Sequence, residues 1–308
     1  MADRAALFPG QGSQQVGMGA ELAEAYPPAR AMFERADEVL GFALSKLCWE
    51  GPEDRLTQTE NAQPAILVHS LAAWSVVSDR LADIVRFAAG HSLGEFSAYA
   101  AAGSLEFDDA VRLVRRRGEL MSAAREGTMA AVLKLEDGAV EDVCRRVRDE
   151  GGVVVAANFN APGQVVISGE VEAVEKARTL ATEAGARVKP LPVSGAFHSP
   201  LMAEAEAGLR EALESVEFRD PRFPVVANAT AEPISDADAA RAALVRQLTA
   251  PVRWTESVRR IAAEGVTRYM EFGPGKVLTG LLKRIDGSLE GVGLGKPGDI
   301  ESFNEGKA

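Results

Sequence analysis

The order of strands and helices predicted in the middle of the chain constrains the fold more than any other feature. Apolar periodicity and turn residues predict, in chain order, a strand, a helix, two strands, a helix and a strand, over residues 129–135, 138–151, 153–160, 164–169, 170–185 and 187–194. The central pair is joined by Pro162-Gly163, a hairpin turn. This order is the ferredoxin-like arrangement. We therefore predict a small ferredoxin-like domain over residues 128–194.

Strands and helices also alternate on either side of this unit. Strands are predicted at 4–8, 84–90, 223–230 and 266–275, with helices between them and a last helix at 276–285. Alternation of this kind indicates an α/β fold with a largely parallel sheet. We predict that residues 1–127 and 195–308 form one large α/β-hydrolase-like domain, interrupted by the small one. The tail after Gly287 is expected to be loosely ordered.

Composition narrows the class of protein. With 308 residues, 46% hydrophobic and 26% charged, the chain has the make-up of a soluble globular protein. The net charge of -11 argues against a general nucleic-acid or anionic-membrane surface. Cys48 and Cys144 lie in no metal-binding spacing, so we expect no zinc site and no disulfide framework. No signal peptide or membrane span is predicted, and we expect a cytoplasmic protein.

A candidate nucleophile lies in the sequence GHSLG at residues 90–94. Glycines two residues before and after Ser92 allow a sharp turn between a strand and a helix. The residues before this sequence read as a strand and those after it as a helix. The Ser92 hydroxyl would then lie above the sheet edge at a helix N-terminus, where developing negative charge is favoured. The alternative is a serine that merely caps the helix.

A nucleophilic serine needs a base, and the chain has three histidines. His91 adjoins Ser92, and its side chain should diverge from the hydroxyl. His69 lies in an apolar helical stretch and is expected to serve packing. His198 lies where the chain returns from the small domain to the large one, which is where a cleft between domains should form. We therefore predict His198 as the base, and a surface residue at a helix start as the alternative.

No clear candidate is found in the sequence for the acid that usually accompanies the serine and the histidine. In α/β-hydrolases an acid lies between the serine and the histidine in chain order. The acidic residues in that interval fall mostly on predicted solvated helix faces or in the small domain. The group that orients the histidine need not be a carboxylate.

Six motifs carry a resemblance that covers nearly the whole chain in order. They are FPGQGSQ, GHSLGE, RRRGELM, ANFNAPGQVVISG, AFHSPLM and QLTAPVRW. Together they resemble the malonyl-CoA:acyl carrier protein transacylases of fatty acid synthesis and the acyltransferase domains of polyketide synthases. The resemblance implies an inserted ferredoxin-like unit and an S-malonyltransferase that works by a ping-pong mechanism. It implies malonyl-CoA and acyl carrier protein as partners.

The resemblance also implies the catalytic roles. Ser92 takes the malonyl group as an ester and His198 is the base. The backbone N–H groups of Gln11 and Leu93 form the oxyanion hole. The main-chain carbonyl of Gln247 orients the histidine, which would account for the missing acid.

Acyl recognition is implied by the same resemblance. Arg117 would hold the malonyl carboxylate, and helical periodicity makes it the most inward of three consecutive arginines. Gln63 matches a residue near the acyl group. Phe197 would narrow the acyl pocket against an α-methyl branch, although Gly195 stands where that signature opens with a histidine. The reaction so implied needs no cofactor and no metal, and a monomer is expected.

Two rival functions stay open at this stage. A serine esterase or thioesterase would use the same serine, so Arg117 and the preference for a thiol over water would have to discriminate it. A catalytically inactive carrier-binding subunit could keep the fold. The choice between fatty acid and polyketide synthesis, and the strictness of malonyl over methylmalonyl or acetyl groups, stay open as well.

Overall fold

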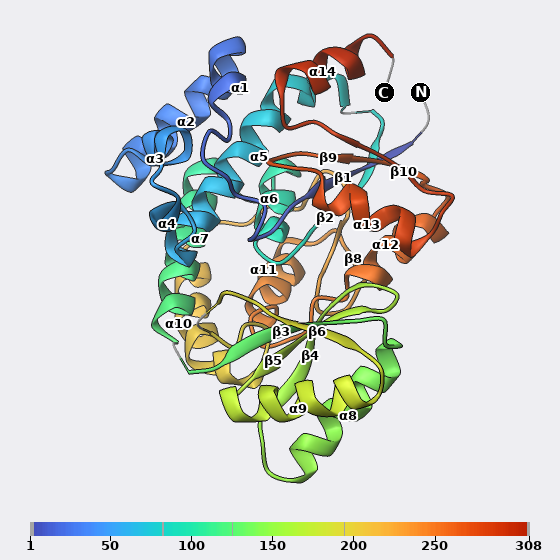
Figure 1. Ribbon diagram of the computed structural model, residues 1–308. Helices are drawn as coiled ribbons and strands as arrows, with labels where there is room; N and C mark the ends of the chain where they lie inside the picture. The colour runs from blue at the N-terminus through green and yellow to red at the C-terminus, as the bar shows by residue number, and fades with distance from the viewer. Residues whose placement is uncertain (1–2, 82, 125, 194, 307–308) are drawn as a thin grey trace.

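A six-stranded sheet forms the centre of the larger of two units in the computed structural model, which describes residues 3–81, 83–124, 126–193 and 195–306 (Figure 1). The strand order is β10–β9–β1–β2–β7–β8. All neighbours are parallel except β7 and β8. The strands are β1 (Arg4–Phe8), β2 (Val85–Gly90), β7 (Val225–Val226), β8 (Pro233–Ile234), β9 (Arg268–Glu271) and β10 (Glu290–Gly293). The predicted α/β architecture with a parallel sheet is confirmed.

Helices cover both faces of this sheet, as a parallel sheet requires. Successive residues of β1 point to opposite faces: Ala5 and Leu7 pack with α12 and α13, whereas Ala6 and Phe8 pack with the helices of the other face. The helices of the unit are α1 (Ala20–Ala25), α2 (Pro27–Leu40), α3 (Leu44–Glu50), α4 (Glu53–Leu56), α5 (Thr59–Leu81), α6 (Gly94–Ala101), α7 (Phe107–Ala123), the 3₁₀ turn η1 (Pro200–Met202), α10 (Ala203–Glu214), α11 (Ala237–Arg246), α12 (Trp254–Ala263), α13 (Val277–Ile285) and α14 (Pro297–Asn304).

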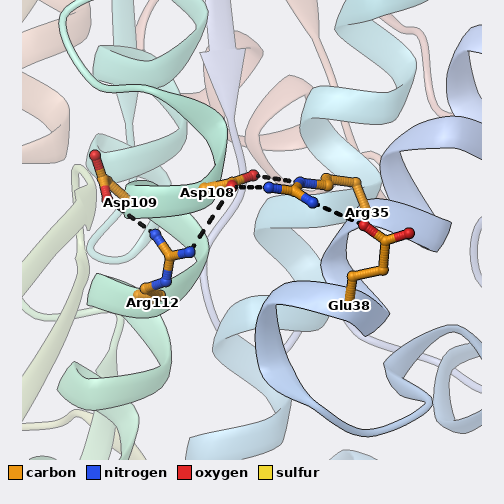
Figure 2. Close-up of polar contacts among 5 residues, drawn as sticks. All are labelled: Arg35, Glu38, Asp108, Asp109 and Arg112. Atoms are coloured by element: carbon orange, nitrogen blue, oxygen red, sulfur yellow. Dashed lines mark hydrogen bonds and ion pairs between the residues drawn. The ribbon is translucent and has the colours of Figure 1, made fainter.

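Ion pairs on the outside of this layer join α2 to the first turn of α7 (Figure 2). Arg35 on α2 donates through Nε to Asp108 at 2.9 Å and also pairs with Glu38 on its own helix. Arg112, one turn along α7, pairs with Asp109 at 3.1 Å and approaches Asp108. Because the two arginine side chains are about half exposed, these ion pairs add little to stability.

The smaller unit contains a four-stranded antiparallel sheet in the order β4–β5–β3–β6. Its elements are β3 (Thr128–Leu133), α8 (Asp137–Asp149), β4 (Val154–Ala161), β5 (Gln164–Gly169), α9 (Val171–Glu183) and β6 (Arg187–Pro190). This is the predicted order of elements, and Ser194 at the end of the predicted strand 187–194 lies outside the described residues. α8 and α9 pack on one face of the sheet, which points away from the larger unit (Figure 1).

Main-chain hydrogen bonds join the two units. The segment before α12 runs beside β4: the Val252 N–H donates to Ala157 O at 2.8 Å, and the Phe159 N–H donates to Val252 O at 2.9 Å. Ala157 and Val252 are completely buried, so separating the units would break hydrogen bonds of buried backbone groups. The segment that carries Gln247 is therefore fixed between the units.

Two sequence predictions about the larger unit are wrong. The tail after Gly287 is ordered as β10 and α14, and α13 is not the last helix. β10 reads EGVG, too short and too poor in apolar residues to show periodicity, and it is fixed by parallel pairing with β9. The strand predicted over 223–230 is only Val225–Val226, because the chain leaves the sheet to bring Asn228 toward the end of β2.

Candidate active site

Ser92 lies in a sharp turn between β2 and α6, at the carboxyl edge of the parallel strands. Its backbone has φ 53°, a left-handed conformation that is unusual for a residue with a side chain. The turn is tight because a Cβ at Gly90 would lie 1.9 Å from the carbonyl of Gly94. The His91 N–H donates to Phe8 O at the end of β1 at 2.9 Å. The two glycines therefore permit the turn, and the strained backbone holds Ser92 clear of the sheet.

Asn228 fixes this turn and was missed by the sequence analysis. Its Oδ1 accepts from the Ser92 N–H at 2.7 Å, and its Nδ2 donates to Gly90 O at 2.6 Å. The side chain is fully buried, so it replaces water for both backbone groups. Asn228 follows β7, the neighbour of β2. A sequence signal existed, since the end of a neighbouring parallel strand is where polar residues reach a common site.

His198 lies beside the serine hydroxyl and is buried. Its Nε2 is 2.8 Å from Ser92 Oγ, and its Nδ1 is 3.0 Å from the main-chain oxygen of Gln247. A carbonyl oxygen only accepts, so Nδ1 carries the hydrogen and Nε2 presents a lone pair to the hydroxyl. Burial, aided by the charge of Arg117, lowers the pKa of His198 to about 3. The imidazole is therefore neutral and arranged to accept a proton from Ser92.

The other two histidines make their contacts elsewhere. His91 lies 2.8 Å through Nε2 from Asn160 Oδ1 and packs against the ring of Trp254. His69 is buried on α5 with Nε2 2.9 Å from Gly295 O, so it donates to that carbonyl. Burial lowers its pKa to about 4. Neither ring is bonded to the Ser92 hydroxyl.

Two backbone N–H groups near Ser92 are free to donate. Leu93 precedes α6, and Gln11 lies in the loop after β1, which touches the serine turn: a Cβ at Gly10 would lie 2.5 Å from His91 O. Within the described part of the chain, neither N–H has an internal acceptor. The N-terminus of α6 adds its dipole at the same place. A backbone N–H without an internal acceptor is available to donate to an oxygen of a bound molecule.

Arg117 brings a buried positive charge to the serine. It lies on the inner stripe of α7, one turn from Leu113 and Val114, and is 1% exposed. Nη2 donates to Ser92 Oγ at 3.0 Å and to Gln247 Oε1 at 2.8 Å, and Nη1 donates to Gln63 Oε1 at 2.8 Å. Burial lowers the pKa of Arg117 to about 9.

No carboxylate pairs directly with this guanidinium among the residues that the structure describes, and its Nε has no partner there. A buried arginine bonded only to neutral oxygens can readily take a bidentate carboxylate.

Glu95, one turn after Ser92 on α6, was also missed. It is completely buried, and its Oε2 accepts from Gln247 Nε2 at 2.7 Å and from the Asn228 N–H at 3.1 Å. Burial raises its pKa to about 7. A signal was present, because a glutamate three residues beyond the nucleophile lies on the same side of the helix as the nucleophile.

The remaining predicted residues lie around this group. Gln63 is buried on α5 and donates to Met121 Sδ at 3.3 Å as well as accepting from Arg117. Phe197 precedes His198 and is 8% exposed. A Cβ at Gly195 would lie 2.6 Å from the Phe197 ring, so a histidine there would displace that ring.

Neither a metal-binding cluster nor a helix that could span a membrane is found in the described ranges. There, no three His, Cys, Asp or Glu side chains are grouped so as to hold a metal ion. No helix among those residues is both long and apolar enough to cross a bilayer.

Comparison with known proteins identifies the family. Residues 6–287 match the acyl transferase domain. The chain is 46% identical to the malonyl CoA-acyl carrier protein transacylase of Bacillus subtilis, over 98% of this chain and 96% of the relative. It is also 46% identical to the transacylase of Escherichia coli K12, over 96% and 97%.

Solved structures give the same result. A malonyl-transacylase in complex with a type II polyketide acyl carrier protein has a TM-score of 0.95 and 44% identity, covering 99% of this chain and 100% of that one. The transacylase of Xanthomonas oryzae has the same score and identity, covering 99% and 98%. The chain belongs to the acyl transferase family and, within it, to the malonyl-CoA:acyl carrier protein transacylases.

Proposed function

We propose that this protein moves a malonyl group from coenzyme A to the phosphopantetheine thiol of an acyl carrier protein, through an ester on Ser92. The observation that carries the proposal is Arg117: a buried guanidinium 3.0 Å from the serine hydroxyl, to which none of the described residues bonds a carboxylate. A substrate whose acyl group ends in a carboxylate would supply the missing partner at the reacting atom.

The first half-reaction forms the ester. Ser92 Oγ attacks the thioester carbonyl while His198 Nε2 takes the hydroxyl proton. The oxyanion accepts hydrogen bonds from the N–H groups of Gln11 and Leu93, and two such donors in a dry site supply about 3 kcal/mol each. The carbon–sulfur bond then breaks, and coenzyme A leaves with the proton that His198 carried.

The second half-reaction reverses these steps with another thiol. His198 takes the proton of the carrier thiol, the thiolate attacks the Ser92 ester, and Ser92 recovers its hydrogen. Gln247 holds His198 through a neutral carbonyl, which stabilises an imidazolium less than a carboxylate does. This is sufficient because a thiol leaving group, with a pKa of about 8.5, needs little protonation.

Three further parts belong to the same proposal. A large α/β-hydrolase-like domain (1–127 and 195–308) carries the catalytic residues, and a ferredoxin-like domain (128–194) packs beside them. Nucleophile, base and oxyanion donors all come from the chain, so the reaction needs no cofactor. We expect a monomer in the cytoplasm. Light scattering of the purified protein can test the oligomeric state.

The rival activities differ in the fate of the ester. An esterase or thioesterase would pass the acyl group to water, and an inactive carrier-binding subunit would form no ester. The test is transfer: protein preloaded with malonyl-CoA and freed of excess substrate is mixed with a phosphopantetheinylated carrier or with buffer. The proposal expects malonyl carrier in the first case and a persistent ester in the second. Rapid loss of the ester in buffer alone would indicate a hydrolase.

A further inference from the structure

Glu95 and Arg117 are two buried charged groups linked through one neutral side chain. The Gln247 amide accepts from Arg117 Nη2 through Oε1 and donates to Glu95 through Nε2. Both charged groups are at most 1% exposed. In the unloaded protein Glu95 is thus the carboxylate nearest in this network to Arg117, although the two do not touch.

A second carboxylate changes this balance. If a malonyl group is bound by Arg117, as the proposed function states, two buried anions share one guanidinium. Like charges held close together in a buried site cannot both stay ionised without a large penalty, so one of them is expected to take up a proton. The malonyl carboxylate would bond Arg117 directly, and Glu95 would not, so Glu95 is the one to be protonated.

We propose that Glu95 is a positioning residue that serves as the exchangeable counter-ion of Arg117: ionised in the unloaded enzyme, it takes up a proton from solvent when a malonyl carboxylate binds the guanidinium. The inference rests on the proposed function and adds to it the uptake of one proton by Glu95 when the substrate binds. Glu95 touches no reacting atom and acts through Gln247.

The surroundings of Glu95 favour such a change of charge. The charged or titratable groups that face it are Arg117 on α7 and Tyr99 one turn along α6. Its other partners, Gln247 and the Asn228 N–H, are neutral donors that both bond Oε2. Oε1 is buried and has no hydrogen-bond partner among the described residues. An ionised carboxylate with one unbonded oxygen is poorly stabilised, and burial raises the pKa of Glu95 to about 7.

The proposal predicts that the protein takes up a proton when it binds a malonyl group but not when it binds an acetyl group. An acetyl group brings no second anion, so it leaves Glu95 ionised. A protonated Glu95 also leaves the full charge of Arg117 to the substrate. Malonyl binding should therefore strengthen as the pH falls toward 7 from above and level off below 7, whereas acetyl binding should show no such change.

The test uses the full-length Ser92→Ala protein, which binds substrate without reacting. Calorimetric titration with malonyl-CoA at about pH 7.5, in two buffers of different ionisation enthalpy, gives the protons taken up per substrate. Because Glu95 with a pKa of about 7 is about three-quarters ionised at this pH, we expect an uptake of up to about three quarters of a proton with malonyl-CoA and none with acetyl-CoA. Adding Glu95→Gln, which keeps an acceptor for both donors but cannot ionise, should abolish the uptake and leave malonyl binding as tight or tighter. The exposed Glu204→Gln on α10 is the matched control and should change neither quantity.

Each other outcome overturns a stated part. Malonyl binding with no proton uptake refutes the role of Glu95 and leaves the proposed function intact. Uptake that persists in the Glu95→Gln protein assigns the proton elsewhere and refutes it too. If Ser92→Ala does not bind malonyl-CoA, the proposed function fails and the inference with it. Should Glu95→Gln not fold, the pH dependence in Ser92→Ala decides. Affinity for malonyl-CoA must rise by up to about tenfold per pH unit as the pH falls toward 7 from above and level off below 7, where Glu95 is protonated before malonyl binds. A profile that is flat above pH 7 refutes the proposal.

Discussion

Replacing Arg117 with alanine separates a structural role from a role in malonyl recognition. In the wild type this guanidinium bonds Gln63, Ser92 and Gln247 from a position that is 1% exposed. Its loss leaves the amide oxygens of the two glutamines unpaired for any substrate. Only a malonyl group is in addition left with a buried, unpaired carboxylate.

The size of the selective effect follows from that difference. Truncating one side of a buried charge pair typically removes about 2 to 5 kcal/mol of binding, or about 30-fold to 4,000-fold. Because Arg117 is so deeply buried, solvent does not screen its interaction with the carboxylate as it would at the surface. We expect kcat/KM for malonyl-CoA to fall in this range. For acetyl-CoA, which loses only the neutral contacts, we expect less than about a tenfold fall.

The assay compares kcat/KM for malonyl-CoA and acetyl-CoA in the wild type and in Arg117→Ala. Arg116→Ala is the matched control, because Arg116 directly precedes Arg117 on α7 and its side chain is 53% exposed. Among the described residues it pairs with Glu119 alone. The control should leave both constants within about twofold of the wild type. A parallel fall for both substrates in Arg117→Ala would refute the reasoning, since Arg117 would then be structural.

Three further variants test the site and its pH behaviour. Gly90→Ala should lower the free energy of unfolding by about 1 to 3 kcal/mol in urea, because the new Cβ would lie 1.9 Å from the Gly94 backbone. In the control Gly138→Ala the new Cβ would have no described atom within 4 Å, so the free energy of unfolding should not fall in this way. Equal stability of the two variants would contradict the tight turn. Asn228→Ala should lower the rate of acylation at least tenfold, because it removes both bonds that hold the serine turn, and an unchanged rate would dismiss that role. Burial lowers the pKa of His69 to about 4, so the unfolded chain takes up its proton first, and stability present above pH 6.5 is lost as the pH falls. Between pH 6.5 and 5 the wild type should therefore lose about 2 kcal/mol more than His69→Gln in urea unfolding, and equal losses would show that His69 is not buried neutral.

Features that depend on local sequence were predictable. The order of elements in the smaller unit follows from apolar periodicity and one hairpin turn, and the turn at Ser92 follows from two glycines and the change of period around them. The inward direction of Arg117 follows from its place on the helical wheel of α7. The expectation that His198 lacks a carboxylate partner came from the scarcity of suitable acids, and the resemblance pointed to the Gln247 carbonyl.

What was missed depends on contacts between distant segments. Asn228 and Glu95 act through bonds to residues more than 130 positions away, and their positions in the sequence indicate the region where they lie but not the partners that they bond. β10 is a strand only because β9 lies beside it. The charge of Glu95 is set by burial, and burial of a glutamate is evident only once the core around α6 is assembled.

The central claim is that Ser92 carries the malonyl group, and intact-mass measurement tests it most directly. Protein mixed with malonyl-CoA and no carrier should gain one malonyl mass, located on the peptide that contains Ser92, and the gain should vanish on adding a phosphopantetheinylated carrier. Ser92→Ala should gain nothing. A malonyl adduct that persists in Ser92→Ala, or no adduct on the wild type, would contradict the account.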